Sequence, residues 1–148
     1  MKVLVLNCGS SSIKYKLFEM TTKEVLAQGG IEKIGLPGSF LKLTLPNGEK
    51  KVIEKDVPEH TTGVQFIFDT LTNAEYGAVS NLHEIKAVGH RVLHGGTKFS
   101  GSVLIDDAVI AAVEECCDLG PLHNPANLKG IYAVQKLLPE VPQVAVFD

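Results

Sequence analysis

The sequence predicts an α/β fold in which one mixed β-sheet carries helices on its outer side. Two observations lead to this class. Short segments with strand-like alternation fill the first third of the 148 residues, and helical periodicity then alternates with short apolar runs. A chain of this length is large enough for one domain with its own core. Its 45% apolar and 21% charged residues match an ordinary globular composition, which excludes a disordered chain.

The strand signals follow one another from the N-terminus. Residues 2–7 form an apolar run that predicts a buried strand. In residues 12–19, Ile13, Tyr15 and Leu17 alternate with Lys14 and Lys16, so apolar side chains occupy one face and lysines the other. Three further strand segments are predicted at 24–31, at 41–45 and at 51–53. The last two flank Asn47-Gly48, a sequence typical of a β-hairpin turn.

Helical patterns begin after residue 60. A capping box at Thr62–Gln65 and the spacing of the following apolar residues predict a helix that ends at Gly77. A short strand at 85–88 comes next. A second helix is predicted from Asp106 to about Cys117. The pair Asn124-Pro125 predicts the start of a third helix, and residues 143–147 predict a closing strand.

Charge and composition exclude several classes of protein. The net charge of −3 argues against a general nucleic-acid binder, which normally carries a basic surplus. No apolar run approaches the roughly 20 residues of a membrane span, and no signal peptide is recognised. The three cysteines are odd in number and two are adjacent, which favours reduced thiols. We therefore expect a cytoplasmic protein.

The turn at residues 7–12 is the first candidate site. It has the sequence Asn-Cys-Gly-Ser-Ser-Ser, and it lies between the first two predicted strands. Small residues leave main-chain N–H groups accessible, and Lys14 adds a positive charge, so the turn suits a phosphate. A strand follows it, which excludes the Gly-rich phosphate loop that opens a helix. The alternative is a tight hairpin that needs small residues for its geometry alone.

The segment 89–96, Gly-His-Arg-Val-Leu-His-Gly-Gly, is the second candidate site. Its Arg91 offers a planar fork that binds carboxylate or phosphoryl oxygens at two points. The alternative is a structural arginine that caps main-chain carbonyls. His90 and His94 lie four apart, but no helix and no intervening carboxylate support a zinc site.

Two more candidates lie near the end of the chain. His123 precedes the predicted helix start at Asn124, where an anion is favoured, although it could equally pack against the helix cap. Leu122 beside it would be either an ordinary loop residue or the wall of an apolar pocket. Asp148 directly follows the last predicted strand, where a carboxylate can bind magnesium or cap a subsequent helix. A strand that ends the chain indicates a piece of a longer protein.

These segments together resemble the acetate kinase family. The resemblance rests on Val-Leu-Asn-Cys-Gly-Ser-Ser-Ser-Ile-Lys, Gly-His-Arg-Val-Leu-His-Gly-Gly, Pro-Leu-His-Asn-Pro-Ala-Asn and Val-Phe-Asp, in this order. It covers the whole chain but only the N-terminal part of the family's length. It implies one lobe of the ribonuclease H-like, actin-like ATPase superfamily, with 1–148 as the N-terminal lobe and the nucleotide-binding C-terminal lobe absent. It also implies Mg²⁺ (or Mn²⁺) and a homodimeric full-length protein.

The resemblance assigns a role to each matching residue. It implies that Asn7 belongs to the metal site, and that Ser10, Ser12 and Lys14 bind nucleotide phosphate. By the same resemblance, Arg91 and Asp148 are the catalytic pair, with Arg91 also gripping the acyl substrate and Asp148 a further candidate metal ligand. The remaining substrate-binding residues are Leu93, Leu122 and His123, of which the leucines surround the acetyl methyl group and the histidine lies near the transferred phosphate.

The resulting expectation is reversible phosphoryl transfer between ATP and acetate, giving acetyl phosphate and ADP. Because the second lobe is missing, we expect the 148 residues alone to be inactive. Two alternatives stay open: a kinase for propionate or another short-chain acid, and a non-catalytic module that binds acyl phosphates or anions. If Lys14, Arg91 and Asp148 faced different surfaces, a purely structural domain would be favoured instead.

Overall fold

The computed structural model describes residues 1–45, 47–75, 77–92, 101–106, 109–111 and 124–147. They contain one eight-stranded sheet with the order β5-β4-β3-β2-β1-β6-β8-β7. Its strands are β1 (Lys2–Cys8), β2 (Ile13–Glu19), β3 (Glu24–Glu32), β4 (Phe40–Thr44), β5 (Lys50–Glu54), β6 (Ile85–Val92), β7 (Gly101–Leu104) and β8 (Gln143–Phe147). The helices bounded within the described residues are α1 (His60–Leu71), the 3₁₀ helix η1 (Leu82–Glu84) and α3 (Asn124–Leu137).

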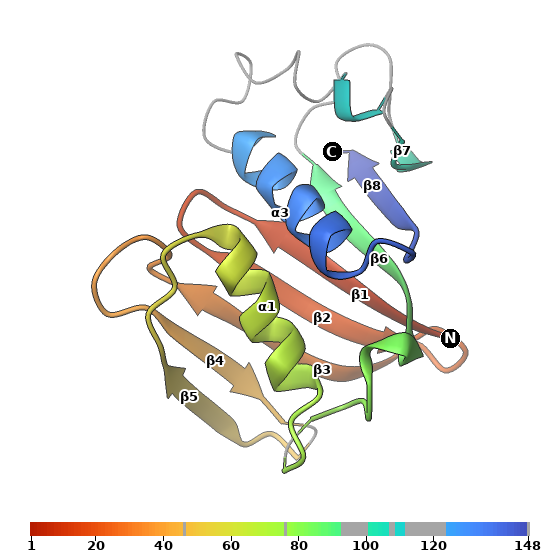
Figure 1. Ribbon diagram of the computed structural model, residues 1–148. Helices are drawn as coiled ribbons and strands as arrows, with labels where there is room; N and C mark the ends of the chain where they lie inside the picture. Colours follow the sequence, from red (N-terminus) through yellow and green to blue (C-terminus); the bar gives the residue numbers. More distant parts are fainter. Residues whose placement is uncertain (46, 76, 93–100, 107–108, 112–123, 148) are drawn as a thin grey trace.

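The sheet joins an antiparallel half to a half built around parallel pairs. Strands β1 to β5 form a meander of antiparallel neighbours, whereas β6 pairs parallel with β1 and β8 pairs parallel with β6. The β7 strand closes this edge, antiparallel to β8. The predicted mixed sheet is confirmed, and β1 lies at the junction of its two halves (Figure 1). The sequence pattern did not predict β7.

Both long helices cover the same face of the sheet (Figure 1). They pack on the apolar side chains of β1 and β2, among them Leu4, Leu6 and Leu17, which are fully buried. Each of the two helices contains a glycine that lets it approach the sheet closely. A Cβ atom at Gly63 of α1 would lie 2.9 Å from Ile13, and one at Gly130 of α3 would lie 2.5 Å from the sulfur of Cys8. The helix side of the sheet is therefore the core.

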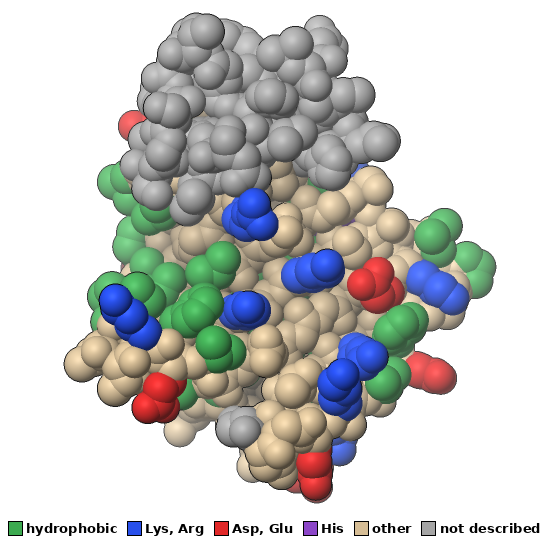
Figure 2. All heavy atoms as spheres, turned by 180° about the vertical axis from the view of Figure 1, so that it is seen from behind, with side chains coloured by type: hydrophobic (Ala, Val, Ile, Leu, Met, Phe, Trp, Pro, Cys, Tyr) green, Lys and Arg blue, Asp and Glu red, His purple; other side chains and the backbone are tan. Residues whose placement is uncertain are grey.

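The opposite face of the sheet carries polar and charged side chains. In β2, Ile13, Tyr15 and Leu17 are buried on the helix side while Lys14 and Lys16 are exposed, as the alternation predicted. Figure 2 shows this face, with lysine and arginine side chains distributed over it. We call it the open face, because the long helices α1 and α3 both lie on the other side.

The boundaries of α1 differ from the prediction. The helix begins at His60, two residues before the predicted capping box at Thr62, and its N-cap residue Glu59 makes no side-chain cap. The side chain of His60, the first residue of the helix, contacts the β1–β2 turn. The helix ends at Leu71, and the main chain turns at Thr72 before the predicted stop at Gly77 is reached.

Other predicted elements agree with the structure. The hairpin at Asn47-Gly48 joins β4 to β5, and Gly48 adopts the left-handed backbone (φ 90°) that favours glycine there. Residues 109–111 are helical, and Asp106 accepts a hydrogen bond from the N–H of Val109 at 2.9 Å, as expected for a helix start. The remainder of that predicted helix lies outside the described residues. The predicted helix start at Asn124 and the strand at 143–147 are confirmed.

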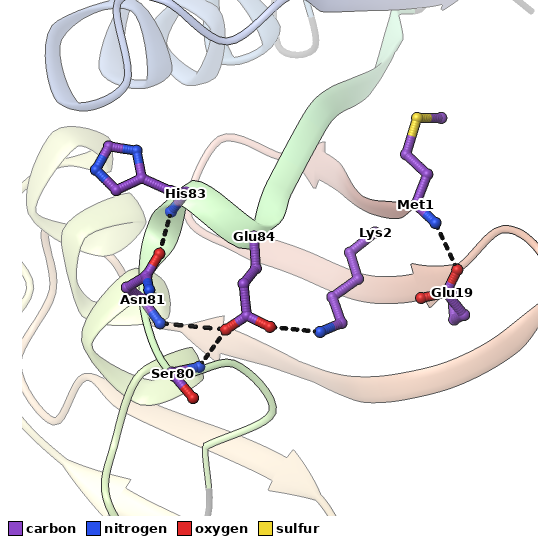
Figure 3. A network of polar contacts seen from close by, with 7 residues as sticks. All are labelled: Met1, Lys2, Glu19, Ser80, Asn81, His83 and Glu84. Atoms are coloured by element: carbon purple, nitrogen blue, oxygen red, sulfur yellow. Dashed lines mark hydrogen bonds and ion pairs between the residues drawn. The ribbon is translucent and has the colours of Figure 1, made fainter.

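A polar network lies at the end of the sheet where β1 begins (Figure 3). The Glu84 carboxylate accepts from Lys2 Nζ at 2.6 Å and from the main-chain N–H groups of Ser80 and Asn81. These donors hold the pKa of Glu84 down at about 2. Nearby, the Met1 amino group pairs with Glu19 at 2.6 Å. The network lies at the end of β1 opposite the β1–β2 turn, so it stabilises the sheet far from the candidate site.

Within the described residues, no helix has the length and apolar character needed to cross a membrane.

Candidate functional site

The turn between β1 and β2 is fixed through its carbonyl groups. Cys8 O accepts a hydrogen bond from the side-chain amide of Asn127 in α3 at 3.0 Å, and Gly9 O accepts from His60 Nε2 at 2.7 Å. The carbonyls of Ser11 and Ser12 accept from the N–H groups of Ile34 and Gly9. Among the described residues, no hydrogen bond uses the main-chain N–H groups of Ser10 or Ser11. The turn is thus rigid, and it retains donors that an anion can use.

Three of the predicted site residues lie in one row across neighbouring strands. Asn7 of β1 pairs directly with Lys14 of β2. The parallel register of β1 with β6 aligns Leu6 with His90, so Arg91 follows beside Asn7. All three are exposed on the open face, next to the end of the β1–β2 turn. The strand pairing therefore brings together an amide oxygen, a lysine and an arginine from positions far apart in the sequence.

A hollow of about 660 Å³ lies on the open face and includes this row. Four lysines and one arginine line it, whereas Glu32 is its only acidic lining residue in the described part of the chain. The cations are Lys14, Lys16, Lys42, Lys50 and Arg91. Phe18 and Phe40 add apolar side chains to its lining. Such an excess of positive charge in a concave surface attracts anions, although the whole chain is weakly acidic.

The residues beneath the row are buried and hydrogen-bonded. His90 lies on the helix side of β6, 2% exposed, and its Nε2 lies 2.6 Å from the side-chain oxygen of Gln143 in β8. The amide of Gln143 donates in turn to Ile131 O of α3. Burial lowers the pKa of His90 to about 4, so the ring is neutral at pH 7. Because a carbonyl oxygen only accepts, the proton of His90 is on Nε2.

The adjacent thiol of Cys8 is also held in its neutral form. It is the free cysteine that the structure describes, and burial raises its pKa to about 12. A thiol with such a pKa is a poor nucleophile, so Cys8 serves as a packing residue against Gly130 of α3. This agrees with the predicted reduced state, while Cys116 and Cys117 lie outside the described residues.

The other predicted site residues are not all placed. Ser10 is exposed and Ser12 half-buried in the turn, whereas Leu93, Leu122, His123 and Asp148 lie outside the described residues. In the part of the chain that the structure describes, no three His, Cys, Asp or Glu residues gather as a metal cluster. Asn7 nevertheless fits Mg²⁺ as a single protein ligand. It offers a hard, exposed oxygen beside a turn suited to phosphate, and Mg²⁺ usually takes its other ligands from phosphates and water.

Two residues that support the turn were not among the predicted site residues. His60 and Asn127 are both 4% exposed, and both donate to turn carbonyls from helices that lie far along the chain. His60 belongs to none of the recognised motifs, and Asn127 ends the Pro-Leu-His-Asn-Pro-Ala-Asn segment without a predicted role. For His60, the available signal was a buried polar side chain on an otherwise apolar helix, because such groups normally have a hydrogen-bond partner.

Comparison with known proteins identifies the family. The model of the acetokinase family matches residues 2–148. The chain belongs to this family. It is 72% identical over all 148 residues to an acetate kinase of Bacteroides thetaiotaomicron and 67% identical to one of Porphyromonas gingivalis. It spans 37% of the length of each of these relatives.

Solved structures agree with this assignment. The crystal structure of the P. gingivalis acetate kinase superposes with a TM-score of 0.97 over 99% of this chain and 37% of its own. A propionate kinase from Francisella tularensis, 38% identical, gives 0.89 over 99% of this chain and 36% of its own. These neighbours have the actin-like ATPase fold, and the predicted superfamily is confirmed. The sheet described above is thus part of a fold used by acyl kinases.

Proposed function

We propose that the full-length protein is an acetate kinase, and that residues 1–148 form its N-terminal lobe. The observation that carries this proposal is the row of Asn7, Lys14 and Arg91 beside the β1–β2 turn. The reaction is reversible phosphoryl transfer between ATP and acetate, giving acetyl phosphate and ADP. Membership of the acetokinase family and the likeness to acetate kinases support the choice of substrates.

The chemistry of this reaction matches what the row offers. A carboxylate oxygen of acetate attacks the γ-phosphorus as the bond to the β-phosphate oxygen breaks, so no proton has to be abstracted from acetate. The difficulty is to bring two anions together and to stabilise the charge on the transferred group. A lysine and an arginine in one hollow, together with main-chain N–H groups of the adjacent turn, supply that stabilisation.

We assign each residue of the row its own task. Arg91 binds the acetate carboxylate through its fork, while Lys14 and the N–H groups of the turn bind phosphate oxygens, helped by the hydroxyls of Ser10 and Ser12. Asn7 would hold Mg²⁺ through its amide oxygen. When bound, the ion neutralises phosphate charge. This division places the acyl substrate on the β6 side of the row and the nucleotide phosphates on the β2 side.

Four residues outside the described part complete the proposed site. Leu93 and Leu122 would line the pocket for the acyl methyl group, and His123 would donate to the transferred phosphate. Asp148 would orient the substrate or take part in holding Mg²⁺. Homodimerisation and a cytoplasmic location of the full-length protein stay predictions from the family resemblance.

A matched pair of lysine variants in the full-length protein tests the proposal. Lys14 and Lys16 are both exposed lysines of β2 that line the hollow, but only Lys14 lies in the row with Asn7, and Lys16 is two residues farther from the turn. Lys14→Met should lower kcat in an acetate-dependent ATP turnover assay by about 100-fold, the order expected for loss of a charge-stabilising donor. Lys16→Met should change kcat by less than about threefold. Equal effects of the two substitutions would contradict the assigned site.

The likeness to a propionate kinase supports one second candidate, a kinase for a longer acyl group. One additional methylene in an apolar pocket changes the discrimination by about 1–3 kcal/mol, or 10- to 200-fold. We expect kcat/KM of the full-length protein to favour acetate over propionate by a factor in this range. A preference for propionate would assign the second activity.

The isolated 148 residues offer a test of the lobe assignment. We expect them to show no acetate-dependent turnover, because they span 37% of the relatives' length. Calorimetric titration with acetyl phosphate then distinguishes a binding lobe from an inert fragment. Turnover by the isolated chain would contradict the assignment of 1–148 as one lobe of a two-lobed active site.

A further inference from the structure

The orientation of the Gly9–Ser10 peptide depends on a contact that no motif indicates. The ring of His60, the first residue of α1, lies 2.7 Å from Gly9 O through its Nε2. The residue is 4% exposed, so water has little access to compete for the carbonyl. The contact joins a helix of the core to the centre of the β1–β2 turn.

We propose that His60 is a positioning residue, which orients the Gly9–Ser10 peptide so that the N–H of Ser10 is available to the bound phosphate. The inference rests on the proposed function, because it assumes that the turn binds phosphate. A trans peptide is planar, and its C=O and N–H groups point in opposite directions. The described chain contains no cis peptide bond. With Gly9 O directed toward α1, the N–H of Ser10 is directed away from α1.

The neighbouring residues explain why this peptide needs a fixed partner. Glycine restricts its backbone less than any other residue, so the peptide after Gly9 can rotate at low cost. A rotated peptide would present the carbonyl oxygen of Gly9 where the Ser10 N–H should be. An oxygen there would repel a phosphate instead of binding it. The hydrogen bond from His60 opposes this rotation, since rotation would leave a buried donor without its acceptor.

The protonation state of His60 fits the role. Burial lowers the pKa of the ring and outweighs the hydrogen bond to Gly9 O, which raises it, while the charges of Lys129 and Glu59 lower and raise it respectively. The ring is therefore neutral at pH 7, with its single proton on Nε2 facing Gly9 O. Asn127 makes the equivalent contact one residue earlier, at Cys8 O, from α3. The two helices thus hold two consecutive carbonyls of the turn.

Two amide substitutions at His60 in the full-length protein provide the test. The amide nitrogen of glutamine extends about as far from the main chain as Nε2 of histidine, whereas that of asparagine is one methylene shorter. His60→Gln should retain the hydrogen bond to Gly9 O, and His60→Asn should lose it. Thr70→Val is the control in the same helix. It removes a buried side-chain hydrogen bond to Phe66 O without any contact to the turn.

We expect kcat/KM for ATP to fall about tenfold in His60→Asn, less than the 10²- to 10³-fold typical for complete removal of an oxyanion donor. In the same variant, KM for acetate should change less than twofold, because Arg91 is untouched. His60→Gln should stay within about threefold of the parent in kcat/KM for ATP, and Thr70→Val should not differ from it. The dissociation constant for ADP, measured by calorimetry, should follow the same order.

Three results would overturn the inference: an Asn variant as active as the control, equal losses in the Gln and Asn variants, or a loss confined to KM for acetate. If the Asn variant does not fold, the Gln variant decides, since a tenfold loss in it contradicts the positioning role. Failure of the proposed function is distinguishable. In that case Lys14→Met also retains its activity, whereas failure of this inference alone leaves the loss of about 100-fold in Lys14→Met unchanged.

Discussion

The close contact between α3 and β1 allows a quantitative prediction. A Cβ atom at Gly130 would lie 2.5 Å from Sγ of Cys8, far inside van der Waals distance, while the next atoms are 3.5 Å and 3.8 Å away. Gly130→Ala must therefore move the helix or the thiol, at a cost of about 3 kcal/mol for an overpacked core. The better helix propensity of alanine returns about 1 kcal/mol. We expect a net loss of about 2 kcal/mol in the free energy of unfolding.

The compensating substitution is Cys8→Ala, which removes the atom responsible for the conflict. Alone it should cost about 1 kcal/mol, as is usual for deletion of one buried heavy atom. In the double variant the new methyl group of residue 130 occupies the space of the lost sulfur, and its nearest neighbour is then at an ordinary contact distance of 3.5 Å. We expect the double variant to be about as stable as the parent, which corresponds to a coupling energy of about 3 kcal/mol.

Urea unfolding of the four proteins of this cycle, followed by far-ultraviolet circular dichroism, measures the coupling. Equal slopes of the unfolding free energy against urea concentration in the four proteins would show that the compactness of their folded and unfolded states is unchanged. Additive losses in the double variant would refute the reasoning. They would mean that α3 does not approach β1 as closely as the contact at Gly130 requires.

The remaining predictions concern pH, charge and the acyl substrate. His90 has a pKa of about 4 in the folded protein against 6.5 in the unfolded chain, so the unfolded state binds more protons between these values. Stability should be full above pH 6.5 and fall by about 3 kcal/mol toward pH 4, and His90→Gln should flatten this profile in urea titrations. Glu84 contributes stability above pH 4.5 that is lost as the pH falls toward 2. Glu84→Gln should therefore lower Tm slightly at pH 7, less so at high salt, and an unchanged Tm at low salt would contradict the ion pair. Arg91→Lys keeps the charge but loses the fork, so kcat/KM for acetate should fall at least tenfold while KM for ATP stays within threefold. Equal changes in the kinetic constants for acetate and for ATP would argue against binding of the acetate carboxylate by Arg91.

Much of the sheet could be predicted, because its signals are local. Lys14 and Lys16 alternate with apolar neighbours in β2, and this period of two is dictated by the strand itself. The same logic fails for β7. Its four residues, Gly-Ser-Val-Leu, are too short to show a period, and the strand exists because β8 offers an unpaired edge. Pairing partners are tertiary information, which no local pattern contains.

The candidate site likewise has a part that local signals predict and a part that depends on tertiary pairing. Asn7 and Lys14 could be placed together, because a tight turn joins their strands. The position of Arg91 beside them depends on the parallel pairing of β6 with β1, which a pattern of apolar residues does not specify. The start of α1 shows the converse case. A local capping box at Thr62 was predicted, but the helix begins two residues earlier, at His60, whose side chain contacts the turn.

The junction of the two half-sheets at β1 has a consequence for the order of folding. Within the meander, strands β1 to β5 pair with their neighbours in sequence, so these pairings close short loops and can form early. The β6 strand must close a much longer loop, since Lys2 of β1 pairs with Ile85. On the ribosome the meander leaves first, with its apolar face uncovered until α1 is complete. A substitution that delays the docking of β6 would thus leave the lysine side of the row assembled before its arginine arrives, and would prolong the lifetime of an aggregation-prone intermediate.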